Sequence, residues 1–203
     1  MLHKQQPHSP MVTDRLKQET LPLHQQLEKW MVQEIKSMQS IDQYINLLQS
    51  FYGFYQPLES NMLPMVEEVV PDLAERRKST LLQQDIDTLQ PVKTSIPLCT
   101  QLPAITNTAA ALGAMYVFEG STLGGAIIAK MVKGKIAGLP DNTLQFFKGY
   151  GTQTMEKWER FKQYTNGFIA SDEQSTALIN GANDTFSLFY QWLKNNQTDT
   201  TNE

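Results

Sequence analysis

Apolar residues recur at spacings of three, four and seven along most of this chain, and no other feature limits its fold as strongly. In the first such segment, after Thr13, the apolar positions are Leu16, Leu23, Leu27, Trp30 and Met31. Residues at these spacings share one face of an α-helix, so the pattern predicts a series of amphipathic helices. We find no convincing alternation of apolar and polar residues of the kind that marks a half-buried strand. We therefore expect an all-α fold, a single-domain bundle of six to eight helices.

Capping residues and prolines divide the chain into helices. Ser40 is expected to cap the second helix. Ser171 is expected to cap the last one, because the Ser-Asp-Glu-Gln that begins there fits a capping box. Pro22 lies inside the first apolar run, where a kink or a restart is expected. Asp72 is expected to open the third helix, and residues 91–103, with three prolines, to form a loop.

The length of 203 residues fits one domain with polar segments at both ends. Residues 1–10 are mostly polar and hold two prolines, and residues 195–203 contain no apolar side chain. Segments of this kind bury too little apolar surface to fold, so both are expected to be disordered. The helical domain is expected to span residues 11–194.

Charge and composition exclude several classes of protein. The net charge is −4, whereas nucleic-acid-binding proteins usually carry a basic surplus. The single cysteine, Cys99, excludes an internal disulfide and a metal site built from cysteines. The first residues lack the apolar core of a signal peptide, and apolar stretches such as 109–117 are shorter than the roughly 20 residues that span a bilayer. We therefore expect a cytoplasmic protein that binds neither nucleic acid nor a membrane.

A glycine-rich peptide interrupts the longest helical segment. Within residues 113–130 the glycines are Gly113, Gly120, Gly124 and Gly125. Each glycine inside a helix costs roughly 0.5–1 kcal/mol relative to alanine, so the missing Cβ atoms must serve another purpose. One interpretation is close packing of helices through small residues. The other is a flat ligand against bare backbone, because Gly120 and Gly124 share one helix face. Periodicity alone does not separate the two.

His24 is the only histidine outside the first ten residues, and it falls on the apolar side of the first helix. A lone histidine in such a place is more often a packed core residue than a ligand. Glu28, four residues later, shifts that balance, because ligating imidazoles commonly donate their second ring N–H to a carboxylate. No second histidine or cysteine accompanies His24, so a metal held by protein ligands alone is not expected. A metal held by a macrocycle needs only one axial protein ligand.

The first helix and the glycine peptide together resemble the haem oxygenase family, in particular its bacterial, biliverdin-producing branch. The peptide Thr20-Leu-Pro-Leu-His-Gln-Gln-Leu-Glu28 is similar to that family's proximal helix, where a histidine followed at i+4 by a glutamate binds the iron. The peptide Glu119-Gly-Ser-Thr-Leu-Gly-Gly125 is similar to the bacterial form of the distal signature. The order and separation of the two peptides also agree, so the resemblance covers nearly all of the helical domain.

The resemblance implies a haem-oxygenase-like bundle that cleaves haem b, as substrate and cofactor, to biliverdin, CO and free iron with O2. His24 would be the axial ligand of the haem iron with Glu28 behind it, and Lys17 and Lys162 would bind the haem propionates. The distal residues implied to act in catalysis are Gly120, Ser121, Thr122, Gly124 and Gly125. Electrons would come from a separate ferredoxin or flavin/NADPH reductase. Residues 130–162, with seven basic and three acidic side chains, would suit both the propionates and an acidic donor.

Ser121 marks a departure from the animal-type pattern, in which an aspartate follows the first glycine of the distal signature and anchors water. Here Ser121 or Thr122 would hold that water. Three alternatives stay open: a non-catalytic protein that binds or stores haem, a thiamin-salvage enzyme of the same fold, and a helical protein without a cofactor. A thiamin enzyme would need a nucleophilic cysteine in its pocket, whereas Cys99 lies in a proline-rich loop. The oligomeric state, monomer or dimer, is also left open.

Overall fold

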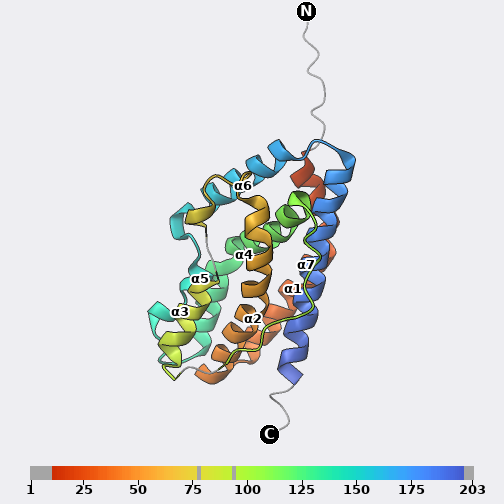
Figure 1. The fold of residues 1–203 in the computed structure, drawn as a ribbon. Helices are drawn as coiled ribbons and strands as arrows, with labels where there is room; N and C mark the ends of the chain where they lie inside the picture. The colour runs from red at the N-terminus through yellow and green to blue at the C-terminus, as the bar shows by residue number, and fades with distance from the viewer. Residues whose placement is uncertain (1–10, 77–78, 93–94, 199–203) are drawn as a thin grey trace, which may run out of the picture.

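In the part of the chain that the structure describes, seven α-helices are joined by loops and 3-10 turns (Figure 1). The structure, a computed structural model, describes residues 11–76, 79–92 and 95–198. The helices are α1 (Val12–Ser37), α2 (Ile41–Val66), α3 (Thr80–Leu89), α4 (Thr108–Lys135), α5 (Gln145–Lys148), α6 (Thr154–Phe168) and α7 (Asp172–Thr198). The 3-10 turns are Leu73–Glu75, Asp141–Thr143 and Gly151–Gln153. No residue within the described ranges lies in a strand, so the all-α prediction is confirmed.

The central helix is α4, which contacts α1, α2, α5, α6 and α7. Every residue of α4 from Ala109 to Glu119 is buried. Its crossing with α7 is close, because a Cβ on Gly113 would overlap the carbonyl oxygen of Leu178. In the same crossing a Cβ on Gly181 would overlap the carbonyl oxygen of Ala110. Helix packing therefore accounts for the first glycine of the α4 peptide.

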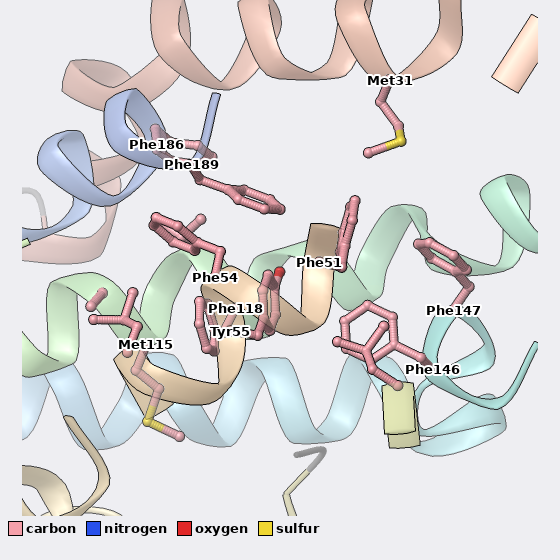
Figure 2. Close-up of a cluster of buried hydrophobic side chains, with 14 of the residues drawn as sticks. Met31, Phe51, Phe54, Tyr55, Met115, Phe118, Phe146, Phe147, Phe186 and Phe189 are labelled. Atoms are coloured by element: carbon pink, nitrogen blue, oxygen red, sulfur yellow. The ribbon is translucent and has the colours of Figure 1, made fainter. Parts of the chain in front are cut away.

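An aromatic cluster fills the space between α2, α4, α5 and α7 (Figure 2). It contains Phe51, Phe54, Tyr55, Phe118, Phe146, Phe147, Phe186 and Phe189. Tyr55 of α2 and Phe118 of α4 stack with ring centroids 3.8 Å apart and planes 9° from parallel. Phe51 meets Phe147 of α5 and Phe189 of α7 edge to face. Since burial of aromatic area is a dominant stabilising contribution, this cluster fixes α2 and α5 against α4 beside the glycine peptide.

Two of the predicted helix caps are confirmed. The hydroxyl of Ser40 accepts from the N–H of Gln43 at 3.2 Å at the start of α2. At the start of α7 the hydroxyl of Ser171 accepts from the N–H of Gln174 at 3.1 Å. The Gln174 side chain in turn accepts from the N–H of Ser171 at 3.2 Å, which completes the capping box.

Three boundaries differ from the sequence-based expectation. Helix α1 continues through Pro22 without a restart. Asp72 does not open the third helix, which begins at Thr80; its carboxylate instead accepts from Arg76 at 2.9 Å. Helix α7 extends to Thr198, so the predicted disorder of residues 195–198 is wrong. The other residues predicted to be disordered, 1–10 and 199–203, lie outside the described part of the chain.

Helix α4 is long and apolar enough to cross a bilayer, judged by length and composition alone. However, 56% of its most apolar 18-residue window is buried inside the molecule. Its neighbours α1, α2, α5, α6 and α7 surround it. The hydropathy of α4 therefore reflects its position as the core helix of a bundle.

Candidate functional site

His24 is an exposed residue in the middle of α1. Its ring packs on Phe186 of α7, with the two ring centroids 5.7 Å apart. Leu27 and Trp30, which follow it along α1, are partly buried against the core. Among the described residues the imidazole has no hydrogen-bond partner, so both ring nitrogens are available to a ligand.

Glu28 follows His24 by one helical turn and is also exposed. In the described part of the chain no hydrogen bond joins its carboxylate to the imidazole. Exposed side chains change rotamer within nanoseconds, so a contact formed on ligand binding needs no backbone movement. The role of Glu28 behind a ligating histidine stays a prediction.

Helices α1 and α4 contact each other, and the buried Thr20 of α1 lies close enough to the buried Tyr116 of α4 for its hydroxyl to influence the pKa of that tyrosine. Burial raises the pKa of Tyr116, and the Thr20 hydroxyl counteracts part of that rise. The two helices run in the same general direction (Figure 1). His24 and Gly120 each follow this contact by one helical turn. The imidazole and the glycine peptide therefore lie on neighbouring segments of the two helices.

The glycines near the middle of α4 are of two kinds. A Cβ on Gly125 would overlap the carbonyl oxygen of Phe147, so this glycine permits the close approach of α5. A Cβ on Gly120 would lie 3.7 Å from the ring of Trp158, which is ordinary contact. A Cβ on Gly124 would meet nothing within 4 Å. Packing therefore explains Gly125, whereas it gives no reason for the bare backbone at Gly124.

The two hydroxyl groups of the peptide are engaged within α4 itself. Ser121 Oγ donates to the carbonyl of Phe118 at 2.7 Å, and it accepts from the Tyr55 hydroxyl at 3.5 Å. Thr122 Oγ1 donates to the carbonyl of Glu119 at 2.6 Å. Since each hydroxyl has one hydrogen, both groups in this arrangement interact with water only as acceptors.

The two predicted propionate lysines lie near the corner where α1 meets α6. At that corner the Asn166 amide donates to the Thr13 hydroxyl and accepts from the Thr13 N–H, each at 3.1 Å. Lys17 follows Thr13 by one turn and is exposed, while Lys162 precedes Asn166 by one turn and is half-buried. Lys162 pairs with Glu159 at 2.9 Å. A partly exposed pair of this kind contributes at most about 1 kcal/mol, so an anionic ligand can replace the glutamate.

A buried cluster of charges adjoins the glycine peptide, and sequence reasoning missed it. Arg76 donates to Glu119 at 2.6 Å and to Asp72 at 2.9 Å. Lys157 of α6 donates to Asp72 at 3.2 Å. The Tyr150 hydroxyl also donates to Glu119, at 2.8 Å. The partners of Glu119 are 43 and 31 residues away along the chain, so no local pattern signals their contact.

The charges in this cluster hold one another ionised. Burial lowers the pKa of Arg76, but the carboxylates of Glu119 and Asp72 outweigh that effect and keep its pKa above the ordinary value. Burial raises the pKa of Asp72, but the hydrogen bonds and charges of Arg76 and Lys157 hold it below the ordinary value. Lys157, which belongs to the segment expected to form a basic surface, instead pairs with Asp72 of this cluster and, at 2.6 Å, with the exposed Glu75.

Two clefts lie away from these residues. One of about 360 Å³ is lined by residues of α2, α3 and the following loop, among them Tyr52, Asp87 and Ile96. The other, of about 220 Å³, lies between Cys99 and the end of α7. The Cys99 thiol donates to the carbonyl of Gln101 at 3.3 Å, and burial raises its pKa. A thiol of this kind is a poor nucleophile, which argues against the thiamin-salvage alternative.

The profile of the family described as Heme oxygenase matches residues 11–195. A Heme oxygenase of Xanthomonas campestris pv. campestris (strain 8004) is 32% identical over 119 residues, which are 58% of this chain and 68% of that one.

Two solved structures share the fold. The NO- and CO-bound heme oxygenase from Neisseria meningitidis has a TM-score of 0.72 at 19% identity, covering 93% of this chain and 92% of that one. The heme oxygenase from Leptospira interrogans has a TM-score of 0.72 at 14% identity, covering 92% of this chain and 100% of that one. With a family match that extends over nearly all of the described helices, the chain belongs to the haem oxygenase family.

Proposed function

We propose that this protein binds haem b between α1 and α4, with His24 as the axial ligand of the iron, and cleaves it to biliverdin, CO and iron. The observation that carries the proposal is the juxtaposition of an exposed, unpartnered imidazole with the uncovered backbone at Gly124. A flat macrocycle with a metal at its centre fits both features. Bound haem supplies the chemistry itself, by activating O2 for attack on one meso carbon of its own ring.

The residues of α1 would hold the iron. One ring nitrogen of His24 would bind it, and Phe186 would support the imidazole from the side of α7. Glu28 would rotate to accept from the second ring N–H, which fixes the ring orientation and makes the imidazole a stronger donor. This arrangement needs only one protein ligand, because the macrocycle itself would hold the iron.

The residues of α4 would cover the opposite face of the haem. Gly124 would let the ring approach the backbone, because a Cβ there would meet nothing within 4 Å, and Gly120, which contacts the Trp158 ring, would lie at the border of the same space. No histidine or arginine lies in the peptide 119–125, so proton delivery would depend on water near Ser121 and Thr122. Both hydroxyls donate to backbone carbonyls, so they would hold that water as acceptors or after rotation.

Charges at the edge of the site would orient the haem. Lys17 is exposed on α1, and Lys162 would exchange Glu159 for a propionate. Electrons would come from a separate ferredoxin or flavin/NADPH reductase in the cytoplasm. Lys130 and Lys135, exposed near the end of α4, are cations that an acidic donor of this kind would contact.

Haemin titration of the purified protein followed by addition of O2 and a reductant tests this function. We expect a Soret band that decays while the absorption of biliverdin appears. A stable Soret band with no biliverdin would favour the haem-storage alternative. No Soret band at all would contradict both haem functions.

A further inference from the structure

A short segment packs against α4 at the glycine peptide, on the side of the helix opposite Gly120 and Gly124. We call residues 147–150 the strap; they are the end of α5 and the two residues after it. The carbonyl of Phe147 lies against Gly125, at the place where a Cβ would stand. A Cβ on Gly149 would lie 3.6 Å from Thr122, and the Tyr150 hydroxyl donates to Glu119 at 2.8 Å. The strap therefore runs antiparallel to α4 and contacts every third residue of that helix, at Gly125, Thr122 and Glu119.

The strap supports the face of α4 that is opposite the bare one. Successive residues of an α-helix are rotated by about 100°, because a turn holds 3.6 residues. The contacts at Glu119, Thr122 and Gly125 therefore centre on Thr122. Gly120 and Gly124 lie two residues to either side of it, which places each of them about 160° away around the helix axis. The glycine face, on which Trp158 contacts Gly120 and no described residue contacts the Cβ position of Gly124, thus points directly away from the strap.

The strap is fixed at both ends. The N–H groups of Gln145 and Phe146, just before it, donate to the buried carboxylate of Asp85 at 3.1 and 2.9 Å. At its other end Tyr150 donates to Glu119, which also accepts from Arg76. Gly149, with φ at +54°, permits the reversal of the chain that brings the Tyr150 hydroxyl onto α4.

We propose that Tyr150 is a positioning residue that latches the strap onto α4 and thereby sets how far the glycine face projects towards α1. At Gly124 no described residue supports α4 from the ligand side, because a Cβ there would meet nothing within 4 Å. The strap supports α4 from the opposite side, at Glu119, Thr122 and Gly125. The proposal rests on the function proposed above, since the space between this face and α1 would hold the haem.

Amide hydrogen exchange on the ligand-free, full-length protein tests the latch without any haem. Tyr150→Phe removes the hydroxyl bond to a carboxylate, and we expect exchange of amides 121–126 to become about tenfold faster, with 109–117 unchanged. Tyr52→Phe is the matched control, because no hydrogen bond engages that hydroxyl in the described part of the chain. Gly149→Ala, which displaces the strap without touching Tyr150, should give the same local effect.

The haem-loaded protein provides the second measurement. A shifted glycine face should alter which meso carbon lies beneath it, so Tyr150→Phe should change the ratio of biliverdin isomers while Tyr52→Phe should not. Unchanged exchange in both strap variants, or an equal acceleration along the whole of α4, would overturn the latch. A wild-type protein that forms no biliverdin would remove the proposed function, while the exchange result would still test the latch.

Discussion

At the scale of single residues, His24 is unusual because the structure gives its ring one apolar contact and no hydrogen bond in the described part of the chain. His24→Ala should therefore change the free energy of unfolding by no more than about 1 kcal/mol. Biliverdin formation should fall by more than about 100-fold, since loss of a group that merely orients a metal ligand already costs 10–100-fold. Thermal unfolding and product absorption measure the two effects. Wild-type turnover without added imidazole would refute the axial role.

The structure shows hydrogen bonds of Ser121 that the sequence did not predict. Its hydroxyl donates to the Phe118 carbonyl, so it holds water less firmly than an ionised carboxylate would. One neutral hydrogen bond is worth about 0.5–1.5 kcal/mol, so Ser121→Ala should slow single-turnover biliverdin formation by about two- to twelvefold. Ser60→Ala removes a similar hydroxyl-to-carbonyl bond, within α2, and should have no effect. Complete loss of biliverdin in Ser121→Ala would show that this hydroxyl does the work of an aspartate.

At the scale of elements, the glycine peptide of α4 serves two purposes: Gly125 permits the close approach of α5, and Gly124 leaves the backbone uncovered. Gly125→Ala would push a Cβ into the backbone oxygen of Phe147 and should destabilise the protein by about 1–3 kcal/mol. Gly124→Leu meets open space, so the ligand-free protein should unfold at an equal or higher temperature. Its haem affinity should nevertheless fall at least about tenfold, equivalent to about 1.4 kcal/mol. Gly134→Leu, also in open space on α4, is the control that should bind haem normally. Equal haem affinities of the wild-type protein, Gly124→Leu and Gly134→Leu would contradict a role of Gly124 in haem binding.

The parts of the fold that the sequence predicted are those determined by neighbouring residues. The caps at Ser40 and Ser171 depend on groups three residues away, and both were correct. Asp72 looked like another cap, but its carboxylate is bound by Lys157, 85 residues later. The same limit applies to the site, because His24 and the glycines are visible as motifs whereas the contact of Glu119 with Arg76 is not. Local patterns carry no information on such long-range pairs.

At the scale of the whole molecule, the buried charges connect parts of the chain that are far apart in the sequence. Arg76 lies between α2 and α3, Glu119 lies in α4 and Lys157 lies in α6. Only 2% of the Arg76 side chain and 4% of the Glu119 side chain are exposed. Removing one partner from such a cluster leaves another charge buried without compensation, which is costly even where the intact pair contributes little. Protonation of a carboxylate in the cluster removes its charge, so the cluster makes the stability of the protein depend on pH.

Asp72 gives that pH dependence a definite sign. Its pKa in the folded protein lies below the ordinary 3.8. The folded state therefore binds the proton less tightly than the unfolded chain, so Asp72 stabilises the protein fully above pH 3.8 and ceases to do so as the pH falls through the lower, folded value. Asp72→Asn should lower the free energy of unfolding at pH 7 by about 1–3 kcal/mol and flatten its decline in acid. Asp141→Asn is the matched control, because the pKa of Asp141 is also lowered, by Lys133, but its side chain is 83% exposed and solvent screens the pair. Urea unfolding between pH 7 and pH 3 should separate the two variants, and identical curves would show that the interior cluster contributes no more than a surface pair.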